Sequence, residues 1–219
     1  MGKRKSYVVW GLGRFGVSVA ETLTELGHEV LGIDNNEETV QRLSTVLTHV
    51  VVTDNIDETT VKALGLRNFD VAIVGIGELQ ANLLCTMLLK EAGVRMIVSK
   101  ASSTLHGKML EKIGADKVIY PERDMGKRVA HNLASSNIMD YIELTDDLSL
   151  MEISLMEDLK DKTLVEADVR RKYGVNVVAI KHKDGTTEIN MDPQKPLVDG
   201  DVLIVIGAKN MVLAMESGL

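Results

Sequence analysis

The chain is poor in cysteine, proline and aromatic residues: it has one cysteine, three prolines and 3% aromatics in 219 residues. The single cysteine, Cys85, cannot form a disulfide within the chain, which favours a reducing compartment. So few aromatic rings offer no platform on which bases or sugars could stack. No apolar run approaches the roughly 18 residues that a membrane-spanning helix needs. We therefore expect any action at a membrane to depend on a second protein.

Charge and motif content exclude further classes. The net charge of −7 argues against a nucleic-acid partner, because phosphate neutralisation needs concentrated Lys and Arg. The basic stretch at 1–5 leads into a short strand, so we expect no signal peptide. None of the five histidines has the spacing of a metal site. The chain also lacks a Ser/His/Asp signature and a Walker loop, and we expect no catalytic residues.

What the chain does have is a glycine-rich turn at 11–16, GLGRFG, between an apolar strand at 7–10 and a helix at 17–26. A second strand then ends on Asp34. This succession of strand, turn, helix, strand and acid is typical of a Rossmann dinucleotide-binding unit. Gly11 permits the tight turn, Gly13 lets phosphate oxygens approach the backbone, and Gly16 lets the helix lie close to the sheet. The open N-terminus of the helix attracts a pyrophosphate. Asp34 can accept hydrogen bonds from ribose hydroxyls and would repel a 2′-phosphate, which favours NAD or an adenine nucleotide over NADP.

The first half of the chain alternates apolar strands with helices, which predicts an α/β fold with a doubly wound parallel sheet in the order 3-2-1-4-5-6. Helices are expected from 35 or 36 to 47, from 57 to 65, at 79–91, and after the strand that ends at 99 through 112. The predicted strands are 7–10, 29–34, 49–53, 70–75, 95–99 and 117–120.

Nucleotide-contact candidates follow from the rule that ligands lie across the carboxyl ends of such strands. The residues placed there are Gly11, Gly13, Arg14, Phe15, Gly16, Asp34, Asn35, Asp54, Asn55, Ile76, Gly77, Glu78 and Lys100. Arg14 can fork onto phosphate oxygens, although a solvated arginine is the alternative. Asp54 and Asn55 could read an adenine edge, or Asp54 could simply cap a turn. Lys100 is either a phosphate contact or a surface lysine.

The pattern changes after residue 121. A helix over 122–134 leads into short strands at 150–154, 176–181, 187–190 and 202–206, with a helix at 165–173, a hairpin turn at 183–185 and a terminal helix at 211–216. We interpret residues 1–121 as the nucleotide-binding domain, 122–139 as a crossover helix and linker, and 140–219 as a small α+β domain.

Several segments together resemble the regulator-of-potassium-conductance (RCK) domain followed by the TrkA C-terminal domain. Besides GLGRFG and Asp34, they are GHEV at 27–30, LGLRNFD at 64–70, KIGADKV at 112–118, PERDMG at 121–126, VRRKYGVNV at 169–177 and GDVLIVIG at 200–207. The resemblance covers nearly the whole chain, and its order and length are similar to those of the regulatory subunits of Ktr potassium transporters.

The resemblance implies a cytoplasmic protein held at the inner face of the membrane by a potassium transporter subunit of the Ktr or Trk type. Homodimers would assemble into an octameric ring, ATP and ADP would compete for the Rossmann crevice, and NAD species could also bind. Arg14 would then contact phosphates and Asp34 the ribose. Glu122 would lie near the phosphates and help to hold a cation, Mg²⁺, Ca²⁺ or Na⁺. Some relatives bind cyclic di-AMP at positions that match Leu164, Arg170, Asn176 and Val177, although Met191 stands where some have proline.

Two other functions stay open at this point. An NAD-dependent oxidoreductase is supported by Asp34, but the chain offers no positioned proton donor. A redox-sensing DNA-binding repressor would need a basic recognition helix, which is not found.

Overall fold

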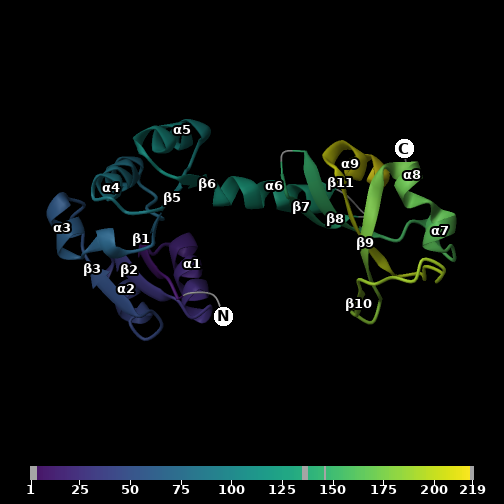
Figure 1. Cartoon of the computed structure of the whole chain (residues 1–219), viewed down its shortest axis with the longest axis horizontal. Coiled ribbons are helices and arrows are strands. Elements are labelled where there is room, and N and C mark those ends of the chain that lie inside the picture. The colour runs from purple at the N-terminus through teal and green to yellow at the C-terminus, as the bar shows by residue number, and fades with distance from the viewer. Residues whose placement is uncertain (1–3, 135–137, 146, 218–219) are drawn as a thin grey trace. The chain divides into compact units, whose positions relative to one another are not determined.

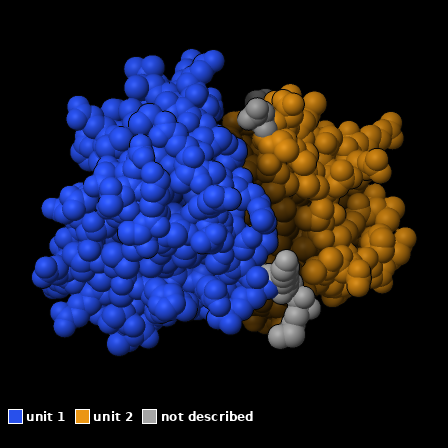
Figure 2. Space-filling model, turned by 60° about the vertical axis from the view of Figure 1, so that its left-hand side comes forward, with its two compact units in different colours: residues 1–122 blue, residues 123–219 orange. Residues whose placement is uncertain are grey.

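The first part of the chain is built round a six-stranded parallel sheet (Figure 1). The computed structural model describes residues 4–134, 138–145 and 147–217, which leaves the first three residues of the basic stretch at 1–5 outside the described part. The chain divides into two compact units, residues 1–122 and 123–219, which Figure 2 colours separately.

Unit 1 contains β1 (Ser6–Trp10), β2 (Glu29–Asp34), β3 (His49–Val52), β4 (Val71–Val74), β5 (Ile97–Lys100) and β6 (Lys117–Ile119). They are paired in parallel in the order β3-β2-β1-β4-β5-β6, which confirms the predicted order. The helices are α1 (Arg14–Glu25), α2 (Glu37–Leu43), α3 (Glu58–Ala63), η1 (Leu66–Asn68), α4 (Leu79–Glu91) and α5 (Thr104–Ile113).

Both faces of this sheet are covered, which is why its strands are apolar throughout. All four residues of β4 are buried. Because side chains alternate along β1, Val8 and Trp10 face one core, shared with α3 and α4, while Val9 faces the other, shared with α1 and α2. The doubly wound α/β prediction is therefore confirmed. The predicted helix to residue 47 is wrong at its end, since α2 stops at Leu43 and a turn follows.

Unit 2 is an antiparallel sheet with helices. Its strands are β7 (Ile138–Glu143), β8 (Leu148–Ser154), β9 (Val175–Lys181), β10 (Thr187–Glu188) and β11 (Val202–Ala208), in the order β10-β9-β11-β8-β7. Its helices are η2 (Glu157–Leu159), α7 (Leu164–Ala167), α8 (Val169–Tyr173) and α9 (Lys209–Ser217), and α6 (Pro121–Ala134) leads into it from unit 1. Helix α9 contacts β8 and β11 over a core that includes Met151, Leu203 and Val212.

Two predictions for this unit are wrong. Strand β7 was not predicted, because Asp140 interrupts its apolar alternation. That carboxylate forms an ion pair with Arg128 of α6, and the next residue, Tyr141, is buried with its hydroxyl 2.9 Å from the Ser149 hydroxyl. The single helix predicted at 165–173 is divided into α7 and α8 by Asp168, whose φ of +41° lies in the left-handed region that Asp tolerates.

Within the described ranges, no helix combines the length and the apolar character that crossing a bilayer requires.

Gly16 tests the close packing of α1 on the sheet. A Cβ at Gly16 would lie 1.9 Å from the carbonyl oxygen of Gly11, which is rigid backbone. Gly126 on α6 is also a helical glycine, but a Cβ there would meet nothing within 4 Å. We expect Gly16→Ala to lower the free energy of unfolding by at least about 2 kcal/mol, and Gly126→Ala to raise it by up to about 1 kcal/mol. Denaturant unfolding of both variants measures the difference, and equal effects would contradict the packing.

His182 gives unit 2 a pH-dependent contact. Its Nδ1 lies 2.9 Å from Asp201 and its Nε2 lies 3.1 Å from Glu188, which also accepts a hydrogen bond from Lys195 at 3.0 Å. Hydrogen bonding to Asp201, and then to Glu188, raises the pKa of His182 above its ordinary value. The contact joins the end of β9 to β10 and to the turn before β11.

The stability supplied by His182 should depend on pH. Because its folded pKa is raised, the stabilisation is fully present below the unfolded pKa of about 6.5 and is lost as the pH rises through the folded value. We therefore expect the thermal midpoint of the wild type to fall over that interval relative to His182→Gln. Thermal melts of both proteins from pH 6 to pH 9 measure the difference in midpoint. A difference that does not change with pH would contradict the raised pKa of His182.

Candidate functional site

A cavity of about 460 Å³ opens at the carboxyl edge of the parallel sheet in unit 1. Its walls are the ends of β1, β2, β3 and β4 and the loops that follow them, as the topology of such sheets requires. The predicted residues that line it are Gly11, Gly13, Asp34, Asn35, Asp54, Ile76, Gly77 and Glu78. The structure thus brings together segments that lie more than 60 residues apart in the sequence.

The floor of this cavity is formed by glycine backbone. Gly11 has a φ of +97°, and a Cβ there would lie 2.6 Å from the nitrogen of Ile76. A Cβ on Gly75 would lie 2.8 Å from the carbonyl oxygen of Gly11. Gly13 differs, because nothing lies within 4 Å of the position of its Cβ. The glycine turn is therefore packed tightly on the side of Gly11 and Gly75. It is open at Gly13, where a ligand can reach the backbone N–H groups.

Helix α1 presents an uncapped N-terminus at this place. Its N-cap residue is Gly13, which makes no side-chain hydrogen bond, and no acidic residue lies in its first turn. In contrast, α2, α3, α4 and α5 are capped by Asn36, Asp57, Glu78 and Ser103. Free N–H groups and the positive end of the helix dipole favour an anion at α1.

Asp34 is held against the glycine turn by its own hydrogen bonds. One carboxylate oxygen accepts from the N–H of Leu12 at 2.5 Å, and the other accepts from the N–H of Asn36 at 2.9 Å. The carboxylate is thus oriented at the end of β2 while each oxygen keeps a lone pair for a further donor. A carboxylate at the end of the second strand can accept hydrogen bonds from ribose hydroxyls.

Further carboxylates make the rest of the cavity acidic. Glu78 caps α4, and hydrogen bonds from the N–H groups of Ala81 and Gln80 hold its pKa below the ordinary value. Asp54 is exposed on the loop after β3. A phosphate is therefore repelled from the β2, β3 and α4 side and is favoured at α1.

The predicted cationic residues lie outside the cavity wall. Arg14 is the exposed first residue of α1. The ammonium of Lys100, at the end of β5, lies 2.6 Å from the Glu122 carboxylate, and the Lys100 side chain is 17% exposed. The hydrogen bond from Lys100, with a smaller contribution from the charge of Arg14, holds the pKa of Glu122 below its ordinary value. The three side chains thus interact electrostatically.

The other predicted residues have structural positions. Phe15 is partly buried in the core on the α1 side, and Gly16 is buried beneath the turn. Asn55 is exposed, and its N–H donates to the Thr53 hydroxyl at 3.1 Å. Phe15, Gly16 and Asn55 do not line the cavity.

Thr53 and Gly75, which stand at the strand ends where the ligand is expected, also line the cavity. Sequence reasoning missed three further lining residues, namely Trp10, Ile56 and Ala81. Ile56 also packs on the core beside α3, and nothing in the local sequence indicates that such an apolar residue reaches the cavity.

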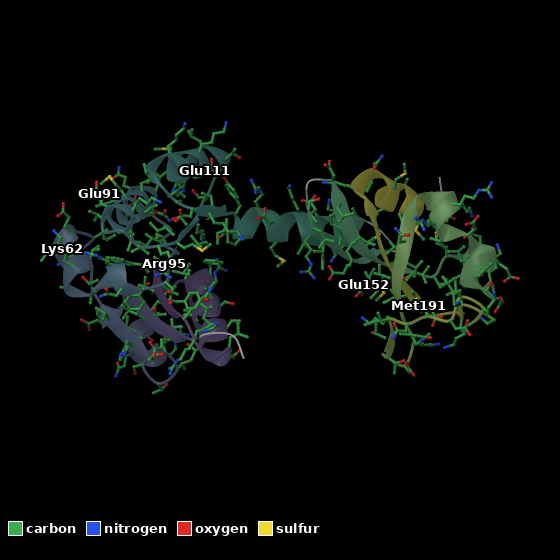
Figure 3. All side chains as sticks on the ribbon, viewed as in Figure 1. Lys62, Glu91, Arg95, Glu111, Glu152 and Met191 are labelled. Carbon is green, nitrogen blue, oxygen red and sulfur yellow. The ribbon has the colours of Figure 1, made fainter. Side chains whose placement is uncertain are left out.

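The second set of candidates lies in unit 2. Leu164 begins α7 and Val177 lies on β9, and both pack, partly buried, on the core of the unit. Met191, labelled in Figure 3, packs on the same core. Arg170 on α8 and Asn176 on β9 are exposed. Leu164, Val177 and Met191 thus contact one core, whereas Arg170 and Asn176 are exposed to solvent, and Asn176 points to the face of β9 opposite to Val177.

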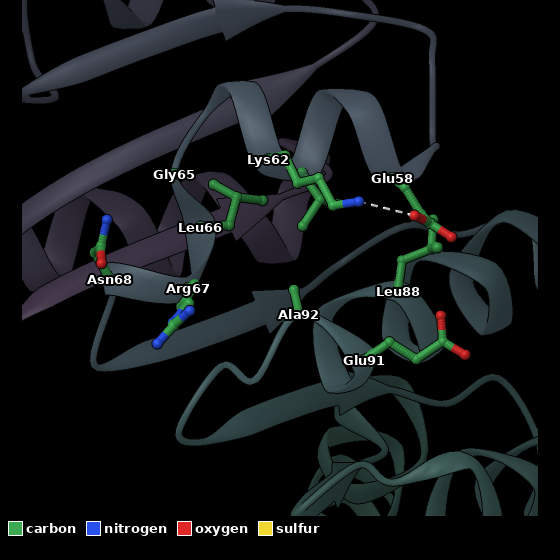
Figure 4. Close-up of a pocket in the computed structure, with 10 residues that line it drawn as sticks. Glu58, Lys62, Gly65, Leu66, Arg67, Asn68, Leu88, Glu91 and Ala92 are labelled. Carbon is green, nitrogen blue, oxygen red and sulfur yellow. Dashed lines mark hydrogen bonds and ion pairs between the residues drawn. The ribbon is translucent and has the colours of Figure 1, made fainter.

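A larger cavity of about 620 Å³ lies between η1, α3 and the end of α4, at the opposite, amino edge of β4 (Figure 4). Lys62 and Glu58 on its rim form an ion pair at 3.0 Å. Helix α3 beside it is capped by Asp57, and the uncapped element there, η1 after Gly65, has only three residues and no Gly-x-Gly-x-x-Gly turn before it. Size alone therefore does not identify a nucleotide site. In the described residues, no group of three His, Cys, Asp or Glu is placed to hold a metal ion.

Comparison with known proteins gives the same division of the chain. Residues 7–121 match the model of the TrkA-N domain and residues 150–217 that of the TrkA-C domain. The chain is 47% identical over 216 residues to Ktr system potassium uptake protein C of Bacillus subtilis (strain 168), covering 97% of this chain and 96% of that protein. It is 40% identical to Ktr system potassium uptake protein A of the same organism, covering 98% and 97%.

Solved structures share the fold. The GsuK RCK domain superposes with a TM-score of 0.69 at 16% identity, over 98% of this chain and 47% of that one. The GsuK channel bound to NAD has a TM-score of 0.55 at 22% identity, over 99% and 38%. This chain therefore spans less than half of each of those chains.

The accessibility of the Cys85 thiol bears on the redox-sensing alternative. Cys85 is fully buried on α4, and burial raises the pKa of its thiol. The thiolate, which is the reactive form, is therefore scarce. We expect Cys85 to react with a thiol reagent at pH 8 only after denaturant is added, and rapid reaction of the native protein would contradict this burial.

Proposed function

The chain belongs to the family of potassium-uptake proteins that combine a TrkA-N and a TrkA-C domain, and we propose that it is the nucleotide-controlled regulatory subunit of a potassium transporter. The observation that carries the proposal is the cavity where the uncapped N-terminus of α1 meets the oriented carboxylate of Asp34. The first attracts phosphates and the second accepts ribose hydroxyls.

ATP and ADP are the proposed ligands, with NAD(H) as a third. Two structures of one channel of the same fold, GsuK, are described as bound to NAD and to ADP. A second anchor for the terminal phosphates is Arg14, the first residue of the open helix end. ATP and ADP differ by one charged group, and only a contact that differs between two conformations can shift their balance.

A cation at Glu122 is part of the proposal. Glu122 contributes one carboxylate, and Lys100 already contacts one of its oxygens. The remaining oxygen ligands for Mg²⁺, Ca²⁺ or Na⁺ must therefore come from the nucleotide phosphates or from another copy of the chain. Such a shared site is consistent with the proposed octameric ring of dimers.

Unit 2 is proposed to bind cyclic di-AMP. Leu164 and Val177 offer apolar contacts for adenine, Arg170 offers a charge for phosphate, and Asn176 offers amide hydrogen bonds. Met191 is a flexible apolar residue that packs on the same core as Leu164 and Val177, and it can adapt to a ring.

The regulatory proposal places the chain at the cytoplasmic face of the membrane, bound to a transporter subunit of the Ktr or Trk type. It also makes the chain a binding protein and not an enzyme, because among the described residues no histidine, lysine, cysteine or tyrosine lines the cavity to act as a general acid or base beside the carboxylates. Nicotinamide turnover with any small substrate would favour the oxidoreductase alternative instead.

Matched arginine variants test the two ligand sites against each other. We expect Arg14→Ala to weaken ATP binding about tenfold, since a charge-assisted hydrogen bond is lost, and to leave cyclic di-AMP binding unchanged. Arg170→Ala should do the reverse, and Arg67→Ala, an exposed arginine on η1, should change neither. Calorimetric titration measures the affinities. Unchanged ATP and ADP affinities in Arg14→Ala would remove this residue from the site.

The transporter partner is tested by co-purification. The tagged chain should retain a potassium-transporting membrane protein, and the amount retained should differ between ATP and ADP in the buffer. A chain that binds nucleotide but retains no such protein would overturn the regulatory proposal while leaving the nucleotide site standing.

A further inference from the structure

Helix α4 is fastened to the sheet by two buried polar contacts. The side-chain amide nitrogen of Asn82 donates to the carbonyl of Ile76 at 2.8 Å and to the carbonyl of Lys100 at 3.1 Å. One helical turn further on, the hydroxyls of Thr86 and Ser99 lie 2.9 Å apart. Asn82 and Thr86 are both fully buried. The first contact joins two strand ends, and the second joins α4 to the middle of β5.

The orientation of the Asn82 amide is fixed by its partners. Reversing it would place its oxygen against two carbonyl oxygens, which are acceptors only. In the orientation found, Oδ1 is buried without a hydrogen-bond partner among the described residues. Leaving such an acceptor unpaired is costly. Helix packing alone would therefore favour an apolar residue here, and the two donated hydrogen bonds account for the asparagine.

The two carbonyl groups that accept hydrogen bonds from Asn82 belong to residues in different parts of unit 1. Ile76 lines the nucleotide cavity, and its backbone nitrogen abuts Gly11 of the glycine turn. Lys100 carries its ammonium to Glu122, the last residue of unit 1 and the second residue of α6. One side chain thus connects the wall of the cavity to the ion pair from which the chain leaves unit 1.

We propose that Asn82 is a positioning residue that couples occupation of the nucleotide cavity to the Lys100–Glu122 ion pair at the start of α6. The coupling rests on the proposed nucleotide function. A ligand that moves the loop at 76–78 moves the carbonyl of Ile76, and the shared amide transmits this displacement to Lys100. Thr86 lacks this role because its partner, Ser99, is buried and lies neither in the cavity wall nor in the ion pair.

Two near-isosteric substitutions separate coupling from simple stability. Asn82→Leu removes both hydrogen bonds to the strand ends, and Thr86→Val removes the control contact on the same helix. Both should destabilise the fold. Asn82→Ser, which is smaller and keeps a hydroxyl, provides a milder variant should Asn82→Leu fail to fold.

The first measurement uses hydrogen exchange of the full chain without nucleotide. We expect amides at 76–81 and at 119–123 to exchange about tenfold faster in Asn82→Leu than in the wild type. Thr86→Val should leave 119–123 unchanged. Unchanged exchange at 119–123 in both Asn82 variants would overturn the proposal, whether or not nucleotide binds.

The second measurement adds ATP at saturating concentration, with binding measured by calorimetry. ATP should change exchange at 119–123 in the wild type and in Thr86→Val. In Asn82→Leu, ATP should bind and protect the glycine turn while the change at 119–123 is lost. A full ATP-dependent change at 119–123 in Asn82→Leu would overturn the coupling. Absence of ATP, ADP and NADH binding to the wild type would instead overturn the proposed function, and the first measurement would still decide the role of Asn82.

Discussion

The main-chain contact among Gly11, Gly16 and Gly75 is the constraint on which the rest of unit 1 depends. The carbonyl oxygen of Gly11 lies where a Cβ on Gly16 or on Gly75 would be placed, at 1.9 and 2.8 Å. Only glycine at both positions lets β1, α1 and the end of β4 meet at this distance. The same turn places Gly13, which has no side chain to cap the helix, at the N-terminus of α1.

The charges around that contact are separated in a way that orients a nucleotide. Asp34, Asp54 and Glu78 make the β2, β3 and α4 side negative, while the open helix end and Arg14 make the α1 side positive. A ligand with a hydroxyl-bearing ribose at one end and phosphates at the other is complementary to this field. Glu122 extends the pattern, since it is held by Lys100 and influenced by Arg14. The position of a terminal phosphate would therefore alter this group of charges first.

Much of this arrangement can be predicted from the sequence, because the motifs that indicate it consist of residues close together in the chain. The order of the six strands, the glycine turn and Asp34 follow from periodicity and from the conformational demands of a tight turn. The elements that were missed depend on distant partners. Strand β7 is stabilised by the ion pair of Asp140 with Arg128 on α6 and by the contact of Tyr141 with Ser149 on β8. Asp140 also interrupts the apolar alternation by which a strand is predicted. The break between α7 and α8 occurs because a single aspartate adopts a left-handed conformation, which the sequence tolerates but does not require.

The sequence by itself determined the fold class, the glycine turn and the carboxylate at the end of β2, because each depends on residues close together in the chain. Only the tertiary structure decided which side chains face the cavity and which are paired elsewhere. It placed Ile56 and Ala81 in the wall, directed Lys100 to Glu122, and used Asn82 to join two strand ends. Such contacts are set by the packing of α4 on β4 and β5. The two residues that Asn82 joins, Ile76 and Lys100, are 24 residues apart in sequence, and no local pattern encodes that proximity.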